Sequence, residues 1–112
     1  PVTRGEWEGS QEMVFPALWV AAAQGETVEV HRLLAEGAAI EERGGPNESS
    51  PLTVAAWAGY EGTVRVLLEH GADVSSRDCG GGTPLTGAKL QGYEAVAVLL
   101  LEASAAKNNS VS

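Results

Sequence analysis

Hydrophobic residues recur at helical spacing in three similar stretches of the chain. In the middle stretch, Leu52, Ala55 and Ala56 stand at i, i+3 and i+4, which places them on one face of a helix. A second run with similar spacing opens near Glu61 and stops at Gly71. The pattern therefore predicts two short helices in this stretch, each with a narrow apolar face.

Residues at the ends of these runs are typical of helix termini. Pro51 suits a first helical turn, because its fixed φ matches the helix and an N–H there would have no helical partner. Ser50 precedes it as a candidate N-cap. Gly59 and Gly71 follow the two runs and suit the positive φ of a residue just beyond a helix.

The same pattern occurs three times. The units are aligned by the glycine after the first run, which is Gly25, Gly59 and Gly92, at spacings of 34 and then 33 residues. We assign the extra residue to the loop at 43–49. A period of this length predicts stacked helix pairs, and alanines on the inner face allow the layers to approach closely. In the third unit the apolar positions are Leu85, Ala88, Ala97, Leu100 and Leu101.

Further residues complete the repeating unit. Its opening, D-x-x-G-x-T-P-L, is formed by Asp78, Gly81, Thr83, Pro84 and Leu85. The remainder is formed by Pro51, Leu52, Ala55, Ala56, Gly59, Val64, Leu67, Leu68, Gly71 and Ala72. On these residues the chain resembles the ankyrin-repeat family. The resemblance implies an all-α solenoid of helix-turn-helix units with projecting β-turn or loop fingers.

The resemblance covers residues 16–106 and implies three repeats, at about 16–48, 49–81 and 82–106. Residues 1–15 match no repeat, and we expect Trp7, Met13, Val14 and Phe15 to pack over the open end of the first layer. A partner-binding arm is the alternative for this segment. Residues 107–112 are polar and are expected to form a frayed tail.

Several positions depart from the family pattern. Its histidine after Pro-Leu is replaced by Trp19, Thr53 and Thr86, so its hydrogen bonds are either missing or made by threonine hydroxyls. In the third repeat, Lys89 replaces the second alanine and Ser104 replaces the final glycine. A lysine is hard to bury in a continuing stack, so we expect a last layer that faces solvent.

Composition and charge narrow the classes of partner. The chain has 112 residues, enough for one domain, and its formal net charge of −8 disfavours nucleic acid. No apolar run approaches the roughly 18 residues of a membrane span. Cys79, the single cysteine, cannot form an internal disulfide, which is compatible with a reducing compartment. We expect a monomer with an intracellular, cytoplasmic location and no nucleic-acid or membrane partner.

The sequence offers no catalytic, cofactor or metal site. Cys79 has no histidine nearby, and the glycines at 80–82 lack the Lys-Ser or Lys-Thr of a phosphate-binding loop. His31 and His70 are placed on the second helices or at their ends, facing other directions. We therefore predict that the chain is not an enzyme.

The family resemblance implies that partners bind at the first helices and the fingers. Trp57 is the strongest candidate, because a large aromatic at a position not needed for the core is typical of an interface anchor. The alternative is that its ring leans on neighbouring layers or covers the N-terminal segment of the same chain. The candidate partner-binding residues are Gln24, Trp57, Ala58, Leu90 and Gln91 on the helices, and Arg43, Asn47, Ser49, Arg77 and Cys79 on the fingers.

Three functions remain open at this point. The first is a scaffold or adaptor that recruits a partner protein whose contact surface is basic or neutral. The second is a regulatory or targeting domain of a larger enzyme whose catalytic part lies outside this chain. The third, a small ligand in the groove, has little support, because few polar groups converge there.

Overall fold

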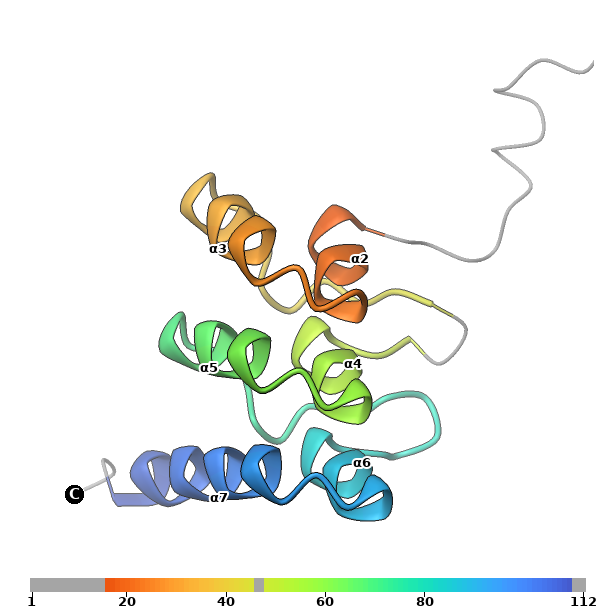
Figure 1. Ribbon diagram of the computed structural model, residues 1–112, viewed down its shortest axis with the longest axis vertical. Helices are drawn as coiled ribbons and strands as arrows, with labels where there is room; N and C mark the ends of the chain where they lie inside the picture. The colour runs from red at the N-terminus through yellow and green to blue at the C-terminus, as the bar shows by residue number, and fades with distance from the viewer. Residues whose placement is uncertain (1–15, 46–47, 110–112) are drawn as a thin grey trace, which may run out of the picture.

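The computed structural model describes residues 16–45 and 48–109, with only the backbone of residues 107–109, and these form three stacked helix pairs (Figure 1). The first layer contains α2 (Ala17–Ala23) and α3 (Thr27–Ala35), and the second contains α4 (Pro51–Ala58) and α5 (Glu61–Glu69). The third contains α6 (Pro84–Gln91) and α7 (Glu94–Asn109). The predicted all-α solenoid is confirmed. The expected packing of residues 1–15 lies outside the described residues.

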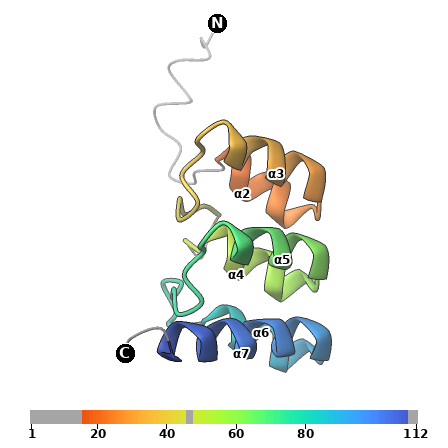
Figure 2. The ribbon, with the colours of Figure 1, turned by 90° about the vertical axis from the view of Figure 1, so that its left-hand side faces the viewer.

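The helices form two columns (Figures 1 and 2). The inner helices α2, α4 and α6 pack on one another beside the connecting loops, and the outer helices α3, α5 and α7 pack in the second column. Each layer therefore contacts only its neighbours, as in other repeat proteins.

The ends of α4 follow the sequence prediction. The Ser50 side chain accepts a hydrogen bond from the backbone N–H of Thr53, and Pro51 occupies the first turn. At the other end Gly59 has φ 82°, and the N–H groups of Gly59 and Tyr60 bond to the carbonyls of Ala56 and Ala55. This Schellman motif needs a left-handed residue, which explains the glycine.

The core is the predicted line of small and branched side chains. Ala22, Ala55, Ala56 and Ala88 are completely buried where the inner helices meet. Short side chains at these positions keep the layers in close contact, since longer ones would push them apart. The prediction was wrong for Leu101, which is 48% exposed, because no described layer follows the third one and covers it.

The outer helix of the last layer is longer than its counterparts. α3 and α5 have nine residues each and stop just before Gly37 and Gly71, whereas α7 has 16 residues. Ser104 stands at the position of those glycines, so nothing at this point favours a left-handed residue that ends the helix. The helix consequently continues beyond residue 106, where we expected the tail to begin.

Two loops project beside the inner helices and form the fingers. In the first, Gly44 and Ser49 pair through two backbone hydrogen bonds of 3.0 and 3.2 Å. In the second, the Asp78 N–H donates to the Gly82 carbonyl at 2.9 Å. Four residues separate the first pair and three separate the second, so the extra residue lies in the first finger, as predicted.

Hydroxyl groups replace the family's histidine in the second layer. The Oγ atoms of Ser50 and Ser76 lie 2.9 Å apart, and Thr53 Oγ1 lies 2.9 Å from Ser50 Oγ and 3.4 Å from Ser76 Oγ. All three residues are buried, and Ser76 belongs to the next loop, so the cluster links two repeats. In the first layer Trp19 Nε1 makes a comparable bond, donating to Ser49 Oγ at 3.2 Å.

Aromatic rings lie directly against glycines of neighbouring layers. A Cβ atom added to Gly25 would lie 2.8 Å from the ring of Tyr60, and one added to Gly59 would lie 2.8 Å from the ring of Tyr93. The contact is closer still on α6, where a Cβ on Gly87 would lie 2.2 Å from Trp57 Cδ1. Trp57 therefore leans on the third layer, and any larger residue at position 87 would displace its ring.

The hydroxyl cluster predicts a difference between two equivalent threonines. Thr53→Val removes a buried hydroxyl that bonds across repeats, so we expect the free energy of unfolding to fall by about 1 kcal/mol. Thr86→Val is the matched control, because Thr86 is exposed and bonds to Thr83 on its own turn. Urea denaturation followed by circular dichroism measures both variants. Equal effects would show that the cluster adds nothing specific.

The contact of Trp57 with Gly87 predicts that Gly87→Ala lowers the stability of the protein, whereas Gly→Ala raises it in an open helix. In an open helix Gly→Ala stabilises by about 1 kcal/mol, but here the new methyl group overlaps the indole, so we expect Gly87→Ala to destabilise by about 1–3 kcal/mol. In a Trp57→Ala background the same substitution should become neutral or stabilising. The four unfolding free energies form a double-mutant cycle. Stabilisation by Gly87→Ala alone would contradict the contact.

Candidate functional site

The second finger and the inner helices enclose a hollow of about 340 Å³. Its residues come from three elements, which are α4, the second finger and the first turn of α6. They are Trp57, Asp78, Cys79, Gly80, Gly82 and Thr86, and this set is called the finger hollow below. The hollow therefore exists only because two successive repeats are stacked.

Trp57 forms the apolar part of the finger hollow. Its ring is half-buried and is in contact with Gly87 and Gly82. A Cβ added to Gly82 would lie 3.4 Å from Trp57 Cζ2. The indole nitrogen is buried and has no hydrogen-bond partner among the described residues. The structure thus supports the alternative that Trp57 packs between layers, while part of the ring still faces the hollow.

Asp78 fixes the shape of the finger rather than offering a free charge. Its Oδ1 accepts hydrogen bonds from the backbone N–H groups of Gly80 at 2.9 Å and Gly82 at 2.8 Å. These bonds hold the turn around Cys79, whose thiol is exposed. The lining contains no histidine or lysine that would act as a base beside this thiol.

Arg43 links the two fingers. Its guanidinium donates to the backbone carbonyl of Glu48 at 2.8 Å and also to the carbonyl of Arg77, which belongs to the next finger. Both arginines are exposed, so their charges face solvent at the same edge of the molecule. Arg43 thus serves the fold while it remains accessible to a partner.

The other predicted positions differ in exposure. Gln24, Leu90 and Gln91 are exposed and Ala58 is half-buried. Leu90 occupies in the third layer the place that Trp57 has in the second, and without a covering layer it is 72% exposed. Ser49 is buried against Trp19, so its side chain is not available at the surface. Asn47 lies outside the described residues.

Two features on the outer helices were missed by sequence reasoning. The rings of His31 and His70 meet edge to face between α3 and the end of α5, with centroids 5.5 Å apart. Arg32 donates hydrogen bonds to Glu29 and Glu36 on its own helix. The bond from Arg32 to Glu29 holds the pKa of the Glu29 carboxyl below its ordinary value. Only the alignment of α3 with α5 would have revealed the histidine pair.

Two kinds of feature, a metal-binding cluster and a membrane-spanning helix, are missing from the part of the chain that the structure describes. It contains no group of three or more His, Cys, Asp or Glu side chains arranged to hold a metal ion. None of its helices combines the length and the apolar character that crossing a membrane requires. The finger hollow is instead a partly apolar depression whose turn is held by the hydrogen bonds of Asp78.

Comparisons with known proteins agree with this architecture. A family model described as ankyrin repeats (3 copies) matches residues 18–111. The crystal structure of the human ASB11 ankyrin repeat domain is similar, with 34% sequence identity and a TM-score of 0.73 over 79% of this chain, which spans 39% of that one. No curated protein matches. Ankyrin repeats generally bind other proteins and are typically non-catalytic. The chain belongs to the ankyrin-repeat family.

Proposed function

We propose that this chain is a non-catalytic scaffold or adaptor that binds a partner protein through the finger hollow and the exposed ends of the inner helices. The observation that carries the proposal is the half-buried Trp57 at the base of the hollow. Tryptophan is enriched among residues that dominate binding energy, above all where surrounding contacts exclude water. The walls formed by the second finger and Thr86 supply such surroundings.

The rigidity of the hollow favours binding. The Trp57 ring is held by Gly87 and Gly82, and the finger is held by Asp78. Side chains that are already fixed lose little conformational entropy when a partner arrives. Trp57 therefore combines packing between layers with an exposed edge for a partner, and Leu90, Gln91 and Gln24 extend that surface along the inner helices.

Charge points to a basic or neutral partner surface. The chain carries a net charge of −8, and two of its cations, Arg32 and Arg65, already pair with glutamates on their own helices. A basic partner surface would be attracted to this excess of negative charge, and salt would screen the attraction. We therefore propose association that weakens as ionic strength rises.

The proposed surface is tested by adding bulk and charge at the finger without touching the core. Cys79 is exposed, so Cys79→Arg should leave circular dichroism and melting unchanged while partner capture falls about tenfold or more. Ala35→Arg is the matched control, since Ala35 is exposed on the outer helix α3, and it should leave capture intact. Quantitative mass spectrometry of proteins captured by the three forms provides the measurement. Equal capture by Cys79→Arg and the unmodified chain would rule out the finger hollow.

A further inference from the structure

The contact between layers repeats one arrangement. The glycine that follows an inner helix receives the tyrosine ring of the next layer, as Gly25 receives Tyr60 and Gly59 receives Tyr93. Gly92 follows α6 with nearly the same backbone, at φ 79°. Within the described chain, no atom beyond its immediate neighbours lies within 4 Å of the position that a Cβ on Gly92 would take. The third glycine thus presents the same contact site without a ring on it.

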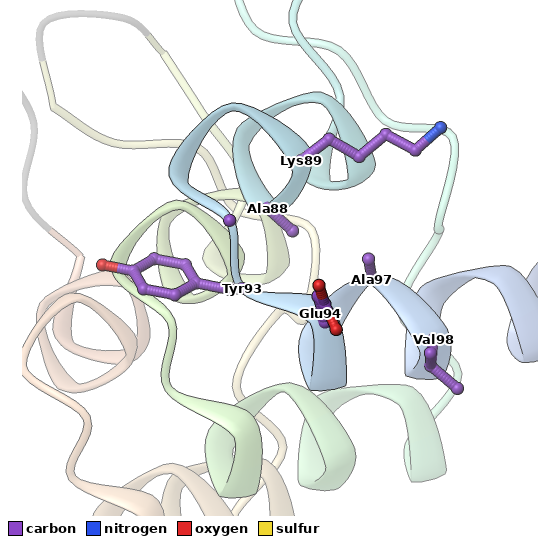
Figure 3. Close-up of a pocket in the computed structure, with 7 residues that line it drawn as sticks. Ala88, Lys89, Tyr93, Glu94, Ala97 and Val98 are labelled. Carbon is purple, nitrogen blue, oxygen red and sulfur yellow. The ribbon is translucent and has the colours of Figure 1, made fainter.

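A second hollow, of about 390 Å³, surrounds this glycine (Figure 3). Ala88 and Lys89 approach it from α6, and Glu94, Ala97 and Val98 approach it from the start of α7. Tyr93 also lines it, although its ring is directed back toward Gly59 in the preceding layer. We call this surface, together with the neighbouring exposed Leu90 and Leu101, the end face.

The end face continues an interface that already exists inside the chain. Three of its residues occupy positions at which the third layer covers the second. Leu90 corresponds to Trp57, Leu101 to Leu68, and Lys89 to Ala56. Ala56 is completely buried by the third layer, whereas Leu90 and Leu101 are 72% and 48% exposed. Apolar side chains of this size at a repeated packing position indicate a surface suited to another pair of helices.

The course of α7 differs from that of the outer helices that lead into a following repeat. After α3 and α5 the chain turns at Gly37 and Gly71 and returns toward the inner column to form a finger. α7 instead remains helical through Asn109 and carries no such turn. A second copy stacked head to tail is also poorly suited, because Glu26 stands in the first layer where the later layers have Tyr60 and Tyr93.

We propose that the end face docks a helix pair of another polypeptide that presents an aromatic side chain at its connecting turn. The ring lies against Gly92 as Tyr60 lies against Gly25. Apolar residues of the partner cover Leu90 and Leu101. Lys89 is a cation at a position that is otherwise alanine, so it selects an acidic residue in the partner. Leu90 also belongs to the surface proposed above along the inner helices, but the docking of this helix pair does not involve the finger hollow.

The aromatic contact is tested first with p-cresol, the side-chain analogue of tyrosine, added to the full chain. We expect saturable shifts of the Gly92, Ala88 and Ala97 amide resonances with about millimolar Kd, as is ordinary for so small a ligand. Gly25 and Gly59 are internal controls, because tyrosine rings already cover them. Equal shifts at all three glycines, or none at Gly92, would overturn the proposal.

The helix pair is tested with a synthetic peptide of residues 50–72, the chain's own second layer, cross-linked so that circular dichroism shows it to be helical. We expect binding to the full chain that weakens about tenfold or more when Tyr60→Ala is made in the peptide, or when Leu101→Glu is made in the chain. Val28→Glu is the matched control, since Val28 is 84% exposed on α3. Binding that is absent or insensitive to Tyr60→Ala overturns the proposal. So does sedimentation showing that Leu101→Glu dissolves a dimer, because a second copy is then the occupant.

Discussion

The structure depends on the close approach of neighbouring inner helices. Ala22, Ala55, Ala56 and Ala88 are buried completely along the line where these helices meet, and no longer side chain fits there. The short distance brings each finger within reach of the next repeat, as the bond from Arg43 to the Arg77 carbonyl shows. It also determines that aromatic rings meet glycines, because only a residue without a Cβ leaves room for a ring between layers so closely packed.

The candidate binding surface follows from the same constraint. The ring of Trp57 is too large for the line of alanines, and it lies instead against Gly87, where it lines the finger hollow. Under the proposed function, one side chain both packs between layers and meets the partner. Substitutions of Trp57 alone therefore mix the two roles, whereas exposed finger residues such as Cys79 report on binding without altering the core.

Much of the fold was predictable from local signals. Ser50, Pro51 and Gly59 mark the ends of α4 by rules that concern only neighbouring residues, and the glycine spacing placed the extra residue in the first finger. The site was less predictable, because its geometry depends on residues about 30 positions apart. The orientation of Trp57 depends on the glycine at position 87, and the burial of Ser49 depends on a tryptophan one layer earlier. The sequence pattern within one repeat does not indicate which residue of a neighbouring repeat a side chain will contact.

The hydrogen bonds by which Arg43 links the two fingers are made to the main chain rather than to side chains. Arg43 donates to the carbonyl oxygens of Glu48 and Arg77, and every amino acid supplies a carbonyl at those positions. The identity of residue 77 can therefore change without cost to this link, whereas position 48, at φ 52°, is limited to residues that tolerate a left-handed backbone. Related chains can therefore change the side chains at the finger tips, and with them what the fingers bind, while the Arg43 guanidinium keeps the two fingers in the same relative position.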